Sequence, residues 1–386
     1  MPADSSRSND RACRRRPPRG ASPRSRTACR PPRTCAPSSD DVRRRAWEPV
    51  KVDFGIQGHL ADVPGRARAL EEIGVDGVFT SEAGSDVFLP LTLVAEHTGL
   101  FCYPNVALAL PRSPMHLAYL GHDLQRLSEG RTALGLGSQI RPHIEKRFSA
   151  RWDRPVGQMR EVIESIRAIH RCWKTGERLD FRGEHYTFTL MTPMFVPQPH
   201  AWDPPPIWLG ALGPQMTRLA GEVADGILVH PFHTRRFLEE VTVPRLEAGL
   251  EAVGRSRDDV AVIPTVVTCA YRDDGERERA LRGARMTLAF YGSTPAYRAT
   301  LEVHGWGEIQ AELNHLTKEG RWDEIPAHID DEVLHTIAVV GTPAEIGREV
   351  AARYGGVAAR IGLSMPYQAE DDLLAEVVSE IRAATS

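Results

Sequence analysis

The stretch from Pro204 to Phe232 reads PPPIWLGALGPQMTRLAGEVADGILVHPF and constrains the fold more than any other part of the chain. A short apolar run ends at Gly210, and residues 214–223 then place apolar side chains at helical intervals along one face. After a turn, the run Ile227–Val229 is typical of a buried parallel strand. A unit of strand, helix and strand with this pattern requires a larger α/β sheet around it.

The same alternation of β-like runs and amphipathic segments continues from Val50 to Leu363. It predicts eight strands, at Lys51–Gln57, Val75–Thr80, Leu100–Leu110, Thr132–Leu136, Ile207–Leu209, Ile227–Val229, Asp259–Ala270 and Gly356–Leu363. Eight strands alternating with helices favour a (β/α)8 TIM barrel over a doubly wound sheet. The first strand is not followed by G-x-G-x-x-G, which also argues against a dinucleotide-binding Rossmann fold.

Several helix ends can be placed from the residues. Two excursions, which are segments that leave the alternation of strands and helices, can be placed as well. Gly74 should end a helix over 63–73, and Ser113 before Pro114 should begin one that runs to Leu127. Single helices are also expected over 234–253 and, as the last of the chain, over 344–354. The excursions are expected after strands four and seven: 177–195 alternates like a hairpin, and 293–325 suggests short helices anchored by Trp306 and Trp322.

The N-terminal residues differ in composition from the rest of the 386-residue chain. Residues 1–45 hold thirteen arginines and four aspartates, a net charge of +9, so the remainder carries −12. We predict that 1–47 is a disordered Arg/Pro/Ser-rich extension, because it has too little apolar surface to fold, and that 48–386 is the barrel domain. The extension could bind nucleic acid or an acidic membrane surface, or it could be upstream sequence with the protein beginning near Trp47.

The acidic charge of the remaining residues argues against nucleic acid as a partner of the folded body. No apolar run approaches the ~20 residues that a membrane-spanning helix needs, so we expect no membrane partner. Cys102, Cys172 and Cys269 stand singly in apolar surroundings, which predicts reduced, buried thiols and a cytoplasmic protein.

In a (β/α)8 barrel the chemistry lies on the loops that follow the strands. Three histidines, His59, His143 and His230, follow predicted strand ends and could together bind zinc. No carboxylate or cysteine accompanies them in a recognisable pattern, and we predict no metal. There is no G-x-S-x-G nucleophile motif, and Glu82 and Asp86, four residues apart in a loop, make an unconvincing acid–base pair.

Anion binding has better support. Gly137-Ser138-Gln139 ends the fourth strand, and the turn Gly210–Gly213 ends the fifth. If the two strands are neighbours, backbone N–H groups, the Ser138 hydroxyl and the start of the following helix could grip one phosphate. Taken alone, the Gly210–Gly213 turn is better explained by packing.

Five segments resemble the luciferase-like monooxygenase superfamily, and specifically its branch of coenzyme F420-dependent oxidoreductases. They are ALGLGSQI, RPHIEKRFS, RLDFRGEHYTF, the stretch from Pro204 to Phe232, and AFYGSTPAYRATLEVHGW. The resemblance covers roughly Val50 to Leu363. It implies a barrel of the bacterial-luciferase type that holds a deazaflavin or flavin at its mouth.

The resemblance also implies roles for individual residues. The cofactor ring should lie over a bulge in strand three with a non-proline cis peptide, which falls at Asn105–Val106 here. Ser81 and Glu82 match the end of strand two, where an acid hydrogen-bonds the cofactor in relatives. The phosphate-side positions implied by the resemblance, with the glycine that precedes them, are Gly137, Ser138, Gln139, Ala211, Leu212 and Gly213.

The expected activity is hydride transfer between F420 and an unidentified small-molecule substrate, with His59, Glu82 and His143 as catalytic residues. An ordinary helix-cap or surface role is an equal alternative for each histidine. Arg141, Lys146, Arg147 and Arg151 offer cations for the acidic tail of F420. The alternatives are an FMN-dependent two-component monooxygenase and a non-catalytic coenzyme-binding barrel. Because members of this superfamily are often homodimers, a homodimer is also an open alternative for this protein.

Overall fold

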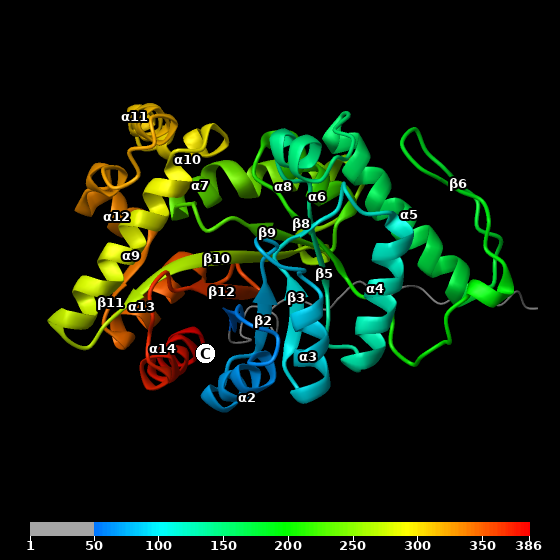
Figure 1. Cartoon of the computed structure of the whole chain (residues 1–386), viewed down its shortest axis with the longest axis horizontal. Helices are drawn as coiled ribbons and strands as arrows, with labels where there is room; N and C mark the ends of the chain where they lie inside the picture. The colour runs from blue at the N-terminus through cyan, green and yellow to red at the C-terminus, as the bar shows by residue number, and fades with distance from the viewer. Residues whose placement is uncertain (1–49) are drawn as a thin grey trace, which may run out of the picture. The chain divides into compact units, whose positions relative to one another are not determined.

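The computed structural model describes residues 50–386, so the predicted extension 1–47 lies outside the described residues. These residues form a barrel of parallel strands surrounded by helices (Figure 1). The barrel strands are β1 Lys51–Gly55, β2 Gly77–Thr80, β3 Phe101–Pro104, β4 Ala107–Leu108, β5 Leu134–Gly137, β8 Ile207–Gly210, β9 Gly226–Val229, β10 Ala261–Ala270 and β12 Arg360–Ser364. The predicted (β/α)8 barrel is confirmed.

Strands β3 and β4 are two halves of the predicted third strand. The hydrogen-bonded order is β3-β2-β1-β12-β10-β9-β8-β5-β4, with every pair along it parallel. A parallel bridge between Cys102 of β3 and Thr132 joins the two ends of this path. The strand is therefore interrupted where Asn105 and Val106 leave the ladder.

The helices confirm most of the expected boundaries. They include α2 Val63–Ile73, α3 Leu89–His97, α4 Pro114–Leu127, α5 Pro155–Thr175, α6 Pro214–Val223, α9 Asp274–Gly292, α13 Pro343–Tyr354 and α14 Asp371–Thr385. Gly74 ends α2 with a left-handed φ of 96°, a conformation that glycine adopts without steric cost. The Ser113 hydroxyl accepts a hydrogen bond from the Met115 N–H at the start of α4.

Two helix predictions were wrong in detail. The single helix expected over 234–253 is α7 Arg235–Phe237 and α8 Val243–Ala252, joined by a π-helical turn over 238–242. The expected last helix corresponds to α13, but α14 follows it with a second amphipathic pattern. The backbone N–H of Val50 donates to the Thr385 hydroxyl at 3.3 Å, so α14 ends beside the start of the described chain.

Both excursions leave the barrel repeat where the sequence predicts (Figure 1). The first contains the antiparallel pair β6 Phe181–Arg182 and β7 Thr187–Phe188, whose turn donates three backbone N–H groups to the Glu161 carboxylate. The second contains α10 Arg298–Glu302, α11 Gly307–Lys318, α12 Asp331–Ile337 and the added strand β11 Val339–Gly341 beside β10. Trp306 packs against this unit, but Trp322 is 47% exposed and is not an anchor.

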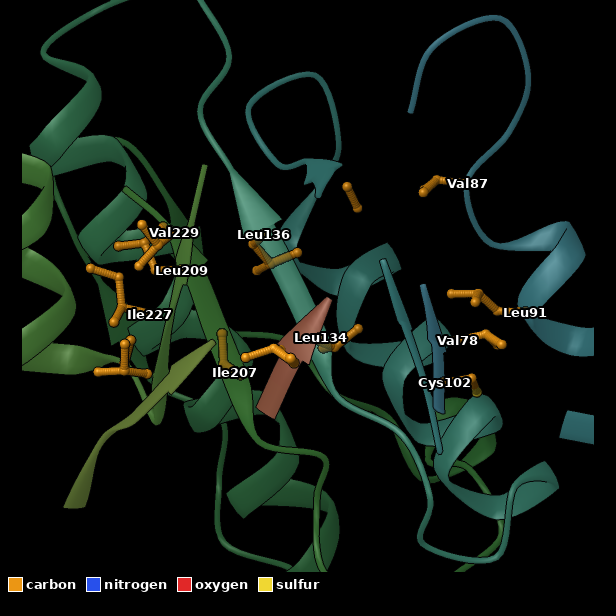
Figure 2. Close-up of a cluster of buried hydrophobic side chains, with 14 of the residues drawn as sticks. Val78, Val87, Leu91, Cys102, Leu134, Leu136, Ile207, Leu209, Ile227 and Val229 are labelled. Atoms are coloured by element: carbon orange, nitrogen blue, oxygen red, sulfur yellow. The ribbon is translucent and has the colours of Figure 1, made fainter. Parts of the chain in front are cut away.

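The apolar residues divide into an outer layer and an inner layer. Alternate strand residues such as Val78, Leu136 and Leu209 face the surrounding helices (Figure 2). The residues between them point into the barrel, where Phe79, Tyr103, Ala133, Trp208, Leu228 and Ile263 form a separate cluster. This alternation is what a closed parallel barrel requires, because its strands are buried on both faces.

A buried ion pair lies next to the inner layer and is hydrogen-bonded to it. Asp53 is fully buried and accepts two hydrogen bonds from Arg360, at 2.8 and 2.5 Å, and one from the Tyr103 hydroxyl at 2.9 Å. A Cβ at Gly77 would lie 2.7 Å from the Asp53 carboxylate and 2.8 Å from Arg360, so glycine leaves the space that the pair fills. Burial also keeps the Tyr103 hydroxyl protonated by raising its pKa.

The predicted burial of the three thiols is confirmed. Cys102, Cys172 and Cys269 are free and buried, and burial raises the pKa of Cys102 to about 11 and of Cys269 to about 12. Within residues 50–386, no helix combines the length and apolar character needed to cross a bilayer.

Candidate active site

A cavity of about 1350 Å³ lies at the ends of the barrel strands, on the side where the sequence predicts the chemistry. Loops that follow nearly every strand contribute to its wall, as do residues of the second excursion. Its lining includes Phe54, Ser81, Glu82, Asn105, Val106, Gly137, Ser138, Gln139, Ala211, Leu212, Gly213, His230, Thr265, Tyr291, Tyr297 and residues 363–371. All the predicted cofactor-binding residues therefore line one cavity.

The bulge between β3 and β4 forms part of the cavity wall. The Asn105–Val106 peptide bond is cis, as the resemblance implies. The Asn105 amide donates to the Thr265 hydroxyl at 2.8 Å, and the Ser81 hydroxyl donates to the Asn105 carbonyl at 3.2 Å. These bonds fasten the bulge to β10 and to the loop after β2.

The Val106 side chain explains two of the glycines. A Cβ at Gly137 would lie 2.6 Å from one Val106 methyl group, and a Cβ at Gly210 would lie 2.8 Å from the other. Both distances are too short for carbon atoms in contact, so glycine is required at the ends of β5 and β8. Packing is thus sufficient to explain Gly137 and Gly210.

The two predicted phosphate turns lie side by side. Strands β5 and β8 pair in parallel with Leu136 opposite Leu209, so Ser138 and the turn before α6 emerge together. No side chain caps α6, and Gly213 has no atom within 4 Å of the position that a Cβ would take. The uncapped helix start leaves first-turn N–H groups for an anionic ligand.

Gln139 has a left-handed φ of 62°, and its side-chain oxygen accepts the N–H of Ile140 at 3.0 Å. The Ser138 hydroxyl donates to the Gln139 carbonyl at 3.2 Å. The turn is therefore held by hydrogen bonds among its own residues. The Ser138 hydroxyl is available as an acceptor, or it can rotate to donate to a ligand.

Glu82 lines the cavity, but its carboxylate is occupied. Its two oxygens accept hydrogen bonds from Arg112 at 2.7 and 2.9 Å, and one of them also accepts the Leu108 N–H at 2.7 Å. Its side chain is 6% exposed. This geometry fastens β4 to the loop after β2 and favours a positioning role; a catalytic role for Glu82 stays a prediction.

His59 and His143 are exposed, and among the described residues neither lines the cavity. After β1 the chain passes through Gly58, which has a positive φ of 122°, and His59 Nδ1 accepts the Ala61 N–H at 3.2 Å. His143 begins a π-helical turn in which Ile144 is the buried residue. Their catalytic roles stay predictions that this geometry does not favour.

The structure brings no three metal-ligating side chains of residues 50–386 together, so the zinc alternative is not formed from the three histidines. None of the four cations offered for the F420 tail lines the cavity either. Arg141 pairs with Glu145 and Arg151 with Asp153, at 2.9 and 2.5 Å, and Arg147 donates to the Ala83 carbonyl.

For His230 the sequence offers two interpretations, a member of that zinc hypothesis and, preferred over it, a hydrogen-bonded histidine at the barrel rim. It follows β9, and its ring stacks on Tyr297 at 4.4 Å and meets the edge of Tyr291 at 4.7 Å. Its position directly after a strand was a usable signal. The contact with Tyr297 was not readable, because 67 residues and an irregular excursion separate the two side chains.

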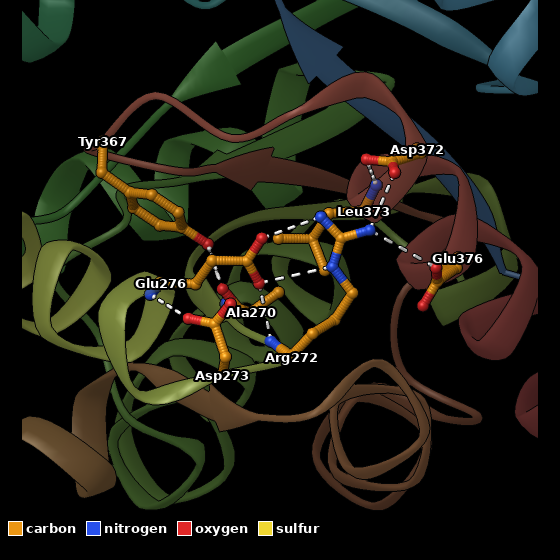
Figure 3. Close-up of polar contacts among 8 residues, drawn as sticks. All are labelled: Ala270, Arg272, Asp273, Glu276, Tyr367, Asp372, Leu373 and Glu376. Atoms are coloured by element: carbon orange, nitrogen blue, oxygen red, sulfur yellow. Dashed lines mark hydrogen bonds and ion pairs between the residues drawn. The ribbon is translucent and has the colours of Figure 1, made fainter.

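The loop after β12 forms another wall and is fastened at its base (Figure 3). The Tyr367 hydroxyl accepts the Ala270 N–H at 2.8 Å and donates to the Ala270 carbonyl at 2.9 Å. Arg272 pairs with Glu276 and with Asp372, each at 2.8 Å. These contacts join α9, α14 and the end of β10.

The sequence profile described as luciferase-like monooxygenase matches residues 43–360. The chain is 47% identical over 313 residues to an uncharacterized protein of Mycobacterium tuberculosis, covering 81% of this chain and 92% of the relative. It is 30% identical over 269 residues to 5,10-methylenetetrahydromethanopterin reductase of Archaeoglobus fulgidus, covering 68% of this chain and 76% of the relative.

Solved structures share the fold. The coenzyme F420-dependent tetrahydromethanopterin reductase of Methanopyrus kandleri superposes with a TM-score of 0.72 at 19% identity, covering 86% of this chain and 98% of that one. The oxygenating constituent of 3,6-diketocamphane monooxygenase of Pseudomonas putida, solved with FMN, gives 0.60 at 18% identity and covers 87% and 98%. The profile match, the relatives and the barrel agree: this chain belongs to the luciferase-like monooxygenase family.

Proposed function

We propose that the protein is an F420-dependent oxidoreductase that transfers hydride between the deazaflavin and a small organic substrate. The observation that carries the proposal is the shape of the cavity at the ends of the barrel strands. It has the bulge at Asn105–Val106 on its wall and an uncapped helix start beside Gly213. A flat ring joined to a phosphate is the kind of ligand that such a pair of features suits.

The residues present fit this group. Gly213 leaves open space at the start of α6, and the Ser138 hydroxyl lies on the adjacent turn. We expect these two turns to hold the phosphate and the bulge with Val106 to support the ring. When bound, F420 supplies a two-electron carrier that gives or takes hydride at a ring carbon. The chain's part is to hold that ring against the substrate and keep the bulge fixed through Thr265 and Ser81.

The choice of F420 over FMN is supported by the relatives. The reductase of M. kandleri, named for its F420 dependence, superposes better than the FMN-bound monooxygenase, with TM-scores of 0.72 and 0.60. The decisive measurement is a fluorescence titration of the full-length protein with F420 and with FMN. We expect F420 to bind at least ten times more tightly; preference for FMN at micromolar concentrations would overturn the cofactor assignment in favour of the monooxygenase alternative.

The Gly213→Val variant tests the phosphate turn. The added side chain meets no protein atom at its Cβ, so the fold should be retained, while it occupies the space in front of α6. We expect F420 affinity to fall tenfold or more, because a phosphate hydrogen-bonded to N–H groups tolerates little displacement. The control is Gly84→Val, another open position that does not line the cavity. Equal affinities of the two variants would refute the phosphate assignment.

A further inference from the structure

One part of the cavity wall has no role in cofactor binding as proposed above. It is formed by His230 and Pro231 after β9 and by Tyr291, Thr294 and Tyr297 at the end of α9 and the start of the second excursion. None of these side chains carries a charge when the histidine is neutral. The charged residues that line the cavity, Arg66, Glu82, Glu370 and Asp371, lie elsewhere. Three of them are paired: Glu82 with Arg112, and Asp371 with Arg66.

Hydrogen bonds fix the proton positions in this wall. The Phe232 N–H donates to His230 Nδ1 at 3.1 Å, so Nδ1 carries no proton in the neutral ring and Nε2 carries it. Nε2 lies 3.1 Å from the Tyr297 hydroxyl oxygen and therefore donates to it. The hydroxyl's own proton is not used in this bond. Among the described residues no other partner of the Tyr297 hydroxyl is found, so this proton is free for a ligand in the cavity.

Burial keeps both groups in these forms. It lowers the pKa of His230 to about 3, with a smaller contribution from His233, and it raises the pKa of Tyr297 to about 12, with a contribution from Tyr291. The imidazole is thus neutral and the phenol protonated throughout the neutral range. The wall presents one oriented donor on an aromatic, uncharged surface, which suits an uncharged ligand with an acceptor oxygen and disfavours an anion.

We propose that Tyr297, oriented by His230, donates a hydrogen bond to the carbonyl oxygen of a neutral, largely apolar substrate. The inference rests on the proposed function, because a carbonyl group is both a hydrogen-bond acceptor and a hydride acceptor. Tyr297 is a catalytic residue in this assignment, and His230 is a positioning residue. The substrate class is therefore an uncharged aldehyde or ketone.

The hydrogen bond from Tyr297 also places the proton that reduction of a carbonyl group requires. Hydride from the reduced two-electron carrier adds to the carbonyl carbon, and the C=O π pair moves to the oxygen. The oxygen takes the Tyr297 proton to give the alcohol. The phenolate that is left still accepts the His230 Nε2–H bond and regains a proton from water, so atoms and charge balance.

The test is binding of acetophenone to the full-length protein, followed by infrared difference spectroscopy of its carbonyl stretch. The wild type should show a band shifted to lower wavenumber, as a hydrogen-bonded carbonyl does. Tyr297→Phe should lose the shift and bind roughly three to ten times more weakly, the effect of one neutral hydrogen bond. Tyr291→Phe removes a hydroxyl from the same wall that is not bonded to His230, and should keep the shifted band.

Two further variants test the positioning role of His230. His230→Leu removes the N–H that orients the hydroxyl, and the band should broaden and shift less. His230→Gln can place an amide N–H near Tyr297 and should restore the shift at least in part. Such a rescue would not follow from packing alone.

The outcomes are distinguishable from failure of the proposed function. No binding of acetophenone, an unshifted band in the wild type, or an unchanged band in Tyr297→Phe overturns this inference, even if F420 binds. Failure of F420 to bind overturns the proposed function, while the carbonyl band still reports on Tyr297.

Discussion

Replacement of Asp53 by alanine should lower the free energy of unfolding by about 3–5 kcal/mol, the cost of leaving one member of a buried ion pair without its partner. Asp53 is fully buried and receives hydrogen bonds from Arg360 and Tyr103 inside the barrel. In the variant the Arg360 guanidinium, in a side chain only 14% exposed, stays in the interior with no carboxylate. Urea unfolding followed by circular dichroism measures the change.

Two further variants separate the charge from the packing. The double variant Asp53→Leu with Arg360→Met leaves no charge of this pair buried. Its free energy of unfolding should therefore fall clearly less than that of Asp53→Ala. Asp53→Asn keeps an acceptor for Tyr103 and should lie between them. A loss below about 1 kcal/mol for Asp53→Ala would contradict the ion-pair account, because it would mean that Arg360 finds water or another partner at little cost.

Acid should destabilise this protein well before its carboxylates protonate. Burial is the largest cause of the lowered pKa of three histidines: His170 to about 4, His230 to about 3 and His233 to about 4. In the unfolded chain each binds a proton near pH 6.5. Between pH 6.5 and about 4 the unfolded state therefore holds more protons than the folded one, and stability falls as the pH is lowered.

Each of the three histidines should lower the free energy of unfolding by about 2 kcal/mol at pH 5. Together they remove several kcal/mol from a free energy of unfolding that is typically about 5–15 kcal/mol. Urea unfolding at pH 7.5 and at pH 5 measures it. His170→Gln removes one of the three groups and should reduce the difference between the two pH values. Equal stability at both pH values in the wild type would show that the three imidazoles can take up protons without unfolding.

The barrel was predictable because its signals are local and repeated. Each strand appears as a short apolar run, and positions such as Gly74 and Ser113 mark helix ends by the conformations and bonds that those residues favour. The extra strand β11 was missed because its pairing with β10, and not periodicity, defines it. The π-helical turn at 238–242 interrupts a stretch whose apolar spacing predicts one continuous helix.

The site was predictable in part for the same reason. Ser138 and Gly213 follow neighbouring strands, so strand order alone brings them together. His59 and His143 follow strands too, but the direction of a loop depends on backbone angles such as that of Gly58. The partner of Glu82, Arg112, lies 30 residues away, and the partner of His230 lies in an irregular excursion. Neither spacing carries a periodic signal.

The bond between the Val50 N–H and the Thr385 hydroxyl has a consequence for protein engineering. It shows that the two ends of the described chain are adjacent, so a short linker could join them without crossing the mouth of the cavity. New ends could then be opened in the exposed segment around Leu190 and Met194, which are 77% and 88% exposed. A circular permutant of this design would keep every barrel strand intact and would leave the cavity wall uncut.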